Sequence, residues 1–155
     1  MRLLLSNVLL ANAIILAWWR GGGPERCFAA ILAAMFLLDR LGHFILGDTG
    51  VGIERTHAVI DLAPLPAMMA IMVIARRLWP IWACSLQLLS AVAHLARPMD
   101  SKIPEIAVRF LAIAPFQLIC LTLIGAVIAH RRRLAQRGYD PSWRRWSQKA
   151  TRPIR

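Results

Sequence analysis

The sequence has 155 residues, of which 58% are hydrophobic and only 17% charged, and its 19 lysines and arginines outnumber its 8 acidic residues. Soluble domains are about half apolar and about a quarter charged, whereas the apolar residues of this chain also fall into long blocks. This composition excludes a soluble globular domain, a disordered chain and a secreted disulfide scaffold, and it favours a small polytopic membrane protein.

Five apolar segments are long enough to cross a hydrocarbon core, which needs about 17–25 residues per helix. In chain order they lie near residues 3–19, 27–47, 57–75, 78–96 and 104–129. We therefore predict an all-α fold, a polytopic transmembrane helix bundle of about five spans over residues 1–129. Residues 130–155 then form a basic, amphipathic cytoplasmic tail.

The first segment also has features of a signal peptide. Residues 1–20 contain one arginine, an apolar run and a small-x-small triplet at Ala11-Asn12-Ala13, the pattern of a cleavage site. The apolar run continues past that triplet into Trp18 and Trp19, so we expect a retained span. Cleavage would leave four spans with the same orientation.

The basic residues predict the orientation of the bundle, because lysine and arginine are enriched in cytoplasmic loops. If the tail is cytoplasmic and there are five spans, thirteen basic residues lie on the cytoplasmic side and four on the opposite side. Trp18, Trp19, Trp79 and Trp82 lie at the cytoplasmic ends of their spans, where the headgroup region favours tryptophan. We expect the N-terminus outside and the C-terminus inside.

Ionisable residues within the spans are the main candidates for a site, because each costs about 2.5–3.5 kcal/mol to insert. Asp39 and His43 are spaced i,i+4, as are His57 and Asp61, so each pair shares one helix face. The two helices are antiparallel and closely connected, so we expect His43 and Asp61 at similar depth. The whole predicted polar cluster, in the outer half of the bundle, is Asp39, Arg40, His43, His57, Asp61, His94 and Arg109.

Three interpretations of this cluster remain open, and the favoured one is structural. Asp39 or Asp61 would pair with Arg40 or Arg109 and hold the bundle together. Alternatively, the cluster binds a metal, with zinc held by three or four of its His and Asp side chains, or haem b between two facing histidines. A pathway for protons, ions or small solutes is the third interpretation. The candidate metal ligands are His43, His57, Asp61 and His94, and the candidate haem pair is His43 with His94.

Prolines within the spans predict breaks, since proline lacks the N–H of an intrahelical hydrogen bond. Pro64 and Pro66 should interrupt the third span, and Pro115 the fifth. The three cysteines form no CxxC motif and indicate neither a disulfide framework nor a zinc knuckle.

The tail carries nine basic residues and one acid, Asp140, and we expect it to lie on anionic lipid of the cytoplasmic leaflet. Asp140 followed by Pro141 is a typical helix start. The residues predicted to face lipid are Arg131, Arg132, Arg133, Trp143, Arg144, Arg145 and Trp146.

These features predict an integral inner (cytoplasmic) membrane protein of bacterial type, favoured as a non-enzymatic accessory or scaffolding component. Its partners would be anionic lipids and either another membrane protein or a second copy of itself; nucleic acid is not expected. No motif specifies a cofactor or a reaction. The alternatives are a metal- or haem-binding membrane protein, with enzymatic activity left open, and a small transporter or pore.

Overall fold

The computed structural model describes residues 2–47, 51–75, 77–96 and 105–143, and these residues are almost entirely helical. The only β-type pairing among them is an isolated bridge between Ala75 and Trp143. The all-α prediction is therefore confirmed for this part of the chain. Its helices are α1 (Arg2–Arg20), α2 (Gly23–Leu46), α3 (Val51–Leu62), α4 (Leu65–Ile74), α5 (Trp79–Ala96) and α6 (Glu105–Arg137).

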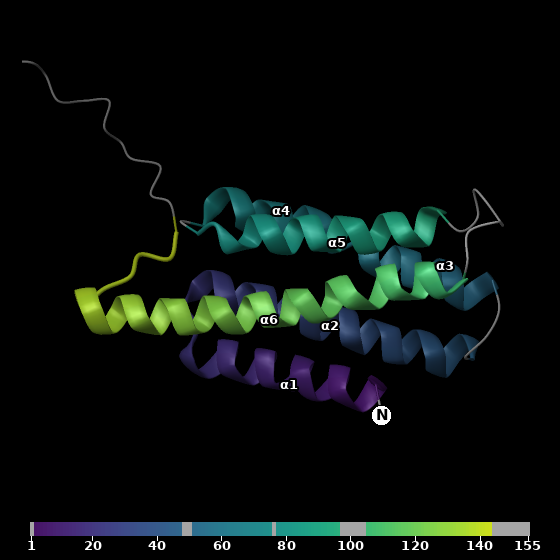
Figure 1. Cartoon of the computed structure of the whole chain (residues 1–155), viewed down its shortest axis with the longest axis horizontal. Coiled ribbons are helices and arrows are strands. Elements are labelled where there is room, and N and C mark those ends of the chain that lie inside the picture. Colours follow the sequence, from purple (N-terminus) through teal and green to yellow (C-terminus); the bar gives the residue numbers. More distant parts are fainter. Residues whose placement is uncertain (1, 48–50, 76, 97–104, 144–155) are drawn as a thin grey trace, which may run out of the picture.

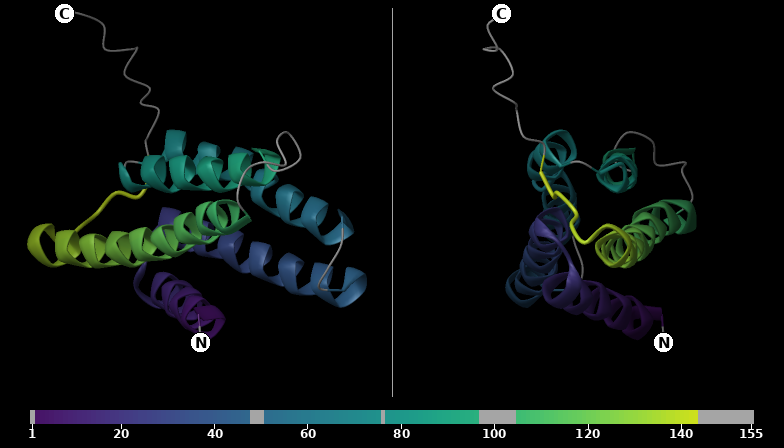
Figure 2. Two further views of the ribbon diagram at one scale, coloured as in Figure 1. Left: turned by 45° about the vertical axis from the view of Figure 1, so that its right-hand side comes forward. Right: turned by 90° about the vertical axis from the view of Figure 1, so that its left-hand side faces the viewer.

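The six helical segments form five rods that run side by side along the long axis (Figure 1). The long α6 packs against α1 and α5, while α2 contacts α1, α3 and α4 (Figure 2). The third predicted span is divided into α3 and α4 by a turn at Ala63–Pro64. Pro64 and Pro66 cannot donate backbone hydrogen bonds, so the predicted break at this point is confirmed.

The last helix differs from its prediction in two ways. α6 passes through Pro115 without interruption, and it continues beyond the predicted boundary at residue 129 to Arg137. Proline removes one hydrogen bond, yet α6 remains continuous across it and packs against α1 and α5. The predicted break at Pro115 is therefore wrong, and the first part of the predicted tail is helix.

Within the part of the chain that the structure describes, three helical stretches are long and apolar enough to cross a membrane: Gly23–Ile45, Thr56–Ile74 and Ile113–Arg137. Two further apolar helices, Leu4–Arg20 and Trp79–Ala93, are shorter. Large apolar side chains cover the outside of the molecule, with Phe44 87% and Trp19 77% exposed. Alanines form much of the buried core, and such small residues are typical of contacts between membrane helices.

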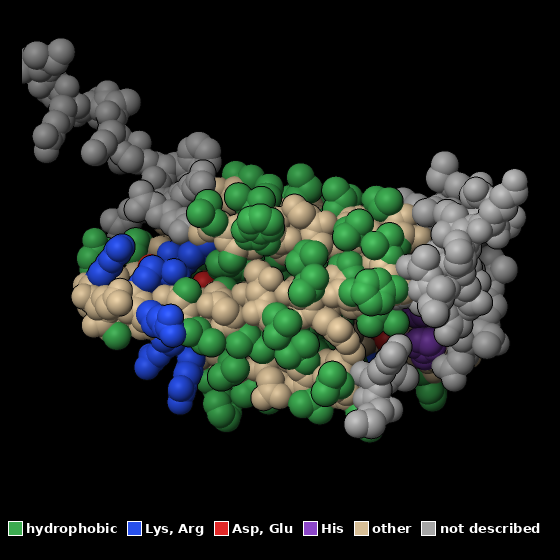
Figure 3. Space-filling model, viewed as in Figure 1, with side chains coloured by type: hydrophobic (Ala, Val, Ile, Leu, Met, Phe, Trp, Pro, Cys, Tyr) green, Lys and Arg blue, Asp and Glu red, His purple; other side chains and the backbone are tan. Residues whose placement is uncertain are grey.

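The two ends of the rods differ in chemistry. We call one the histidine end, defined by Asp39, His43 and His57, where α2 ends and α3 begins. The other is the basic end, defined by Glu25, Arg77, His130, Arg133 and Asp140. Blue arginine side chains gather at one end of the space-filling view, and a purple histidine is visible toward the other end (Figure 3).

Candidate functional site

At the histidine end, two imidazoles and one carboxylate converge. The Nε2 atom of His57 lies 3.2 Å from Nε2 of His43 and 3.2 Å from Oδ1 of Asp39. The same Asp39 oxygen lies 3.8 Å from Nε2 of His43. The three side chains are only 26–31% exposed, so a partly shielded group of three potential metal ligands is formed between α2 and α3.

This arrangement depends on where α3 begins. The sequence placed the start of the third span at residue 57, but α3 starts at Val51. His57 therefore lies within α3, at the level of Asp39 and His43, although it remains at the start of the apolar span Thr56–Ile74, close to the predicted position. As a result His43 contacts His57, whereas the sequence analysis placed Asp61 at its depth.

Asp61 is held by a different helix. Its Oδ2 atom accepts a hydrogen bond from the Ser90 hydroxyl at 2.8 Å, and its Oδ1 accepts one from Nε2 of Gln87 at 3.2 Å. Gln87 also donates to the backbone carbonyl of Asp61 at 3.0 Å. Asp61 thus joins α3 to α5 and is not one of the three converging ligands.

The arginine–carboxylate pair described in this region is local. Arg40 donates from a terminal nitrogen to Oδ2 of Asp39 at 3.0 Å, and the two residues are adjacent on α2. A pair on one helix cannot tie two helices together, so this contact does not supply the predicted clamp. The side chains of His94 and Arg109 lie outside the described part of the structure, and their predicted roles stay predictions.

The ligand separations fit a small metal ion. Tetrahedral zinc with ligand atoms at about 2.1 Å places those atoms about 3.4 Å from one another. The three separations here, 3.2, 3.2 and 3.8 Å, lie around that value. Three protein ligands leave a further coordination position for water or substrate, the pattern of open zinc sites.

Haem fits this group less well than a small ion. Two imidazole nitrogens at 3.2 Å are already within hydrogen-bond distance. Placing a porphyrin iron between His43 and His57 would require α2 and α3 to separate. The predicted haem pair of His43 with His94 involves a side chain that the structure does not describe.

The basic end contains a second polar group that the sequence analysis did not identify. Oδ2 of Asp140 accepts hydrogen bonds from Arg77 at 2.7 Å and from Nε of Arg133 at 3.1 Å, and it lies 2.7 Å from Nδ1 of His130. Glu25 lies behind them, fully buried, with Oε1 3.6 Å from Nε of Arg77. The cluster therefore joins α2, the α4–α5 connection, α6 and the segment after α6.

The charge environment stabilises the ionised form of Asp140. Burial by itself raises the pKa of this carboxyl. The hydrogen bonds with His130 and Arg133 and the charges of Arg77 and Arg133 lower the pKa by more than burial raises it, so the pKa lies below the ordinary value. The sequence did contain a signal for this cluster. The segments predicted to be cytoplasmic hold thirteen basic residues and only two acidic ones, Glu25 and Asp140.

The predicted tail divides into parts with different outcomes. Arg131 and Arg132 are exposed on α6, whereas Arg133 points into the Asp140 cluster. Asp140 does not start a helix, since residues 138–143 are non-helical. Its carboxylate instead contacts the side chains of Arg77, His130 and Arg133. Trp143 bridges to Ala75. The predicted lipid contacts of Arg144, Arg145 and Trp146 lie outside the described residues.

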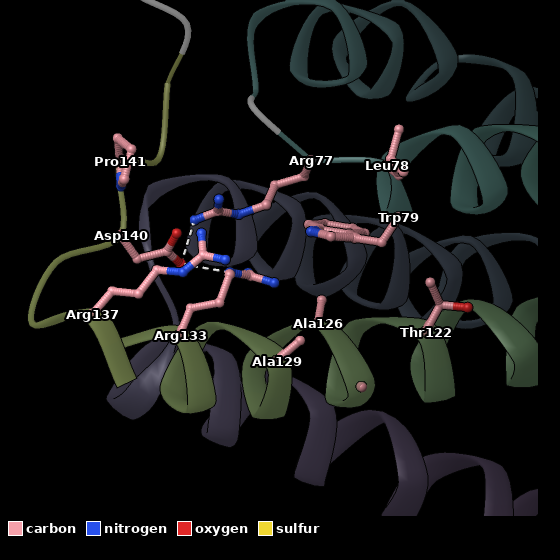
Figure 4. A pocket seen from close by; sticks show the side chains of 11 residues that line it. Arg77, Leu78, Trp79, Thr122, Ala126, Ala129, Arg133, Arg137, Asp140 and Pro141 are labelled. Atoms are coloured by element: carbon pink, nitrogen blue, oxygen red, sulfur yellow. Dashed lines mark hydrogen bonds and ion pairs between the residues drawn. The ribbon is translucent and has the colours of Figure 1, made fainter. Parts of the chain in front are cut away.

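A cavity of about 560 Å³ opens beside this cluster, between the start of α5 and the last turns of α6 (Figure 4). Its charged lining comes from Arg77, Arg133, Arg137 and Asp140. Its apolar lining includes Leu78 and Trp79 and the small residues Gly125, Ala126 and Ala129. Charged and apolar surfaces thus meet within one cavity.

Comparison with known proteins adds no assignment: no protein-family model, curated protein or solved structure matches this chain.

Proposed function

We propose that this chain is a multi-pass protein of the inner (cytoplasmic) membrane that binds a divalent transition metal through Asp39, His43 and His57. Three observations support the membrane assignment: the three long apolar helices, the large exposed hydrophobic side chains and the excess of basic residues on one side. α1 and α5, at 19 and 18 residues, are about 27–28 Å long and nearly match a hydrocarbon core of about 30 Å.

The metal proposal rests on the convergence of three ligand atoms within 4.8 Å of one another. Two imidazoles and one carboxylate suit zinc, and the same donor set with open positions is used by non-haem iron(II). Zinc is favoured because the separations lie near those of a tetrahedral site. The sequence favoured a purely scaffolding role. Because the three ligand atoms converge, we now favour the metal-binding alternative.

The test is metal binding by the full chain in mild detergent. We expect elemental analysis of the purified protein to find about one zinc or iron ion per chain. Titration of the metal-free protein with Co²⁺ should produce the visible absorption of a tetrahedral site. His43→Ala and His57→Ala should each weaken Zn²⁺ binding by about 100-fold or more, because each removes a direct ligand.

Asp61→Asn is the matched control, since it alters an intramembrane carboxylate of α3 that is bonded to Ser90 and Gln87 instead. This variant should keep the metal if it remains folded. Folded wild-type protein that binds neither Zn²⁺, Co²⁺ nor Fe²⁺ would refute the metal site. Equal binding by wild type, His43→Ala and His57→Ala would also refute it.

A further inference from the structure

The cavity at the basic end combines an excess of positive charge with buried hydrogen-bond donors. Among the described residues that line it, three arginines face one carboxylate, Asp140. One terminal nitrogen of Arg133 and the indole Nε1 of Trp79 are buried and have no hydrogen-bond acceptor in the described structure. A buried donor without an acceptor costs free energy. The oxygens of a bound anion would accept hydrogen bonds from these two donors.

The shape of the cavity indicates what kind of molecule carries that anion. The arginines lie at one side, toward the end of α6, while Gly125, Ala126 and Ala129 form a floor of small residues along the helix. A Cβ added at Gly125 would meet nothing within 4 Å, so the floor is open at this point. A ligand with a negatively charged head group and an apolar body would place its head beside the arginines and its body along the small-residue floor.

The position along the rods agrees with that interpretation. Trp18, Trp19 and Trp82 lie toward the same end and are 58%, 77% and 69% exposed. Exposed tryptophans of membrane proteins lie at the level of the lipid headgroups. The arginine side of the cavity is then at headgroup level, and its small-residue floor faces the acyl chains.

We propose that this cavity is a binding site for one anionic phospholipid, whose phosphate is held by Arg133, Arg137 and Trp79. Guanidinium groups bind phosphate oxygens through paired hydrogen bonds, and the indole N–H supplies one more donor. The glycerol backbone of the lipid would lie between Trp79 and Gly125, which both line the cavity. A volume of about 560 Å³ lies within the range of about 300–1,000 Å³ typical of small-molecule sites. The inference rests on membrane insertion, as proposed above, but not on the metal site.

The experiment is native mass spectrometry of the full-length protein released from nanodiscs of phosphatidylglycerol and phosphatidylcholine in equal amounts. We expect wild type to retain one phosphatidylglycerol in preference to phosphatidylcholine. Arg137→Gln should reduce that retention about fivefold, the equivalent of one basic residue's attraction to anionic lipid. Gly125→Leu should reduce it without any change of charge, because the new side chain fills the floor.

Arg132→Gln is the matched control, since Arg132 is an exposed arginine of α6 that does not line the cavity. Retention reduced equally by Arg132→Gln and Arg137→Gln, with Gly125→Leu unchanged, would leave only general attraction to a basic surface and overturn the site. Displacement of the lipid by equimolar inorganic phosphate would overturn the lipid as the source of the anion.

The metal content of the same samples separates this inference from the proposed function. Arg137→Gln and Gly125→Leu should leave the metal content unchanged, because both residues lie far along α6 from the histidine end. Lost lipid selectivity with metal retained refutes the lipid site alone. Absence of metal with lipid selectivity intact refutes the metal site alone. A chain that does not enter nanodiscs refutes the membrane assignment and, with it, the lipid site.

Discussion

The Asp140 carboxylate is the single group that most segments of the basic end share. Its side chain is only 5% exposed, and it contacts Arg77, His130 and Arg133. The chain reaches this position through a left-handed turn at Gly138, with φ of 72°, a conformation that glycine adopts without strain. The contacts of one side chain thereby fix the segment that follows α6 against the α4–α5 connection.

Asp140→Asn should lower the stability of the folded protein by about 2 kcal/mol, because it removes charge-assisted hydrogen bonds and leaves buried cations less compensated. The lowered pKa of Asp140 means that its contribution is present above the ordinary value of 3.8 and is lost as pH falls through the lower folded-state value. Thermal unfolding in detergent checks this, with Tyr139→Phe as the neighbouring control.

The pH series makes the prediction specific. The difference in melting temperature between wild type and Asp140→Asn should persist at about pH 5, and its loss should begin only under more acidic conditions. A difference that vanishes already at about pH 5 would contradict the lowered pKa.

At the scale of elements, the break between α3 and α4 decides where His57 lies. α3 (Val51–Leu62) packs against α2 and α5, and α4 begins at Leu65 after the turn at Ala63–Pro64. Because Pro64 and Pro66 uncouple the two halves, α3 aligns with the end of α2 independently of α4. We infer that this freedom allows His57 to contact His43 and Asp39.

Replacing both prolines by alanine should restore hydrogen bonds to the carbonyls of Ile60 and Leu62 and merge α3 and α4 into one helix. We expect higher helical content by circular dichroism and Zn²⁺ binding weakened about tenfold or more, although no ligand is changed. Pro115→Ala is the control, since α6 is already continuous there. Unchanged Zn²⁺ affinity in a straightened helix would show that the break does not position His57.

At the scale of the whole molecule, charge is distributed unequally between the two ends. Arginines gather at the basic end and the Asp39, His43 and His57 group lies at the other (Figure 3). Basic residues are retained on the cytoplasmic side during insertion. We therefore expect the proposed metal site to face outward and the proposed lipid cavity to lie in the cytoplasmic leaflet.

Reporter fusions test this orientation directly. A fluorescent protein fused after Arg155 should fluoresce, whereas alkaline phosphatase should be active when inserted near residue 100 and inactive at the C-terminus. A small N-terminal tag should be retained and accessible from outside if the first span is kept. The opposite pattern of activities would invert the proposed topology, and loss of the tag would indicate four spans.

The composition and apolar blocks of the sequence determined that the chain forms helices, where they lie and where the third one breaks, because hydropathy and proline chemistry are local properties. The same local signals placed Asp39, His43 and His57 among the candidates. They could not say that Asp61 bonds to Ser90 and Gln87, since that choice depends on how helices rotate and align.

Only the tertiary structure brought the basic end together. Glu25, Arg77, His130 and Asp140 are separated along the chain by as many as 115 positions, and they meet because α2, α5 and α6 are packed in one bundle. Helix continuity through Pro115 is likewise seen only in the structure, where α6 packs against α1 and α5. Local sequence accounts for most of the elements, whereas both sites arise from packing between elements. These elements are consecutive at the histidine end and distant in the chain at the basic end.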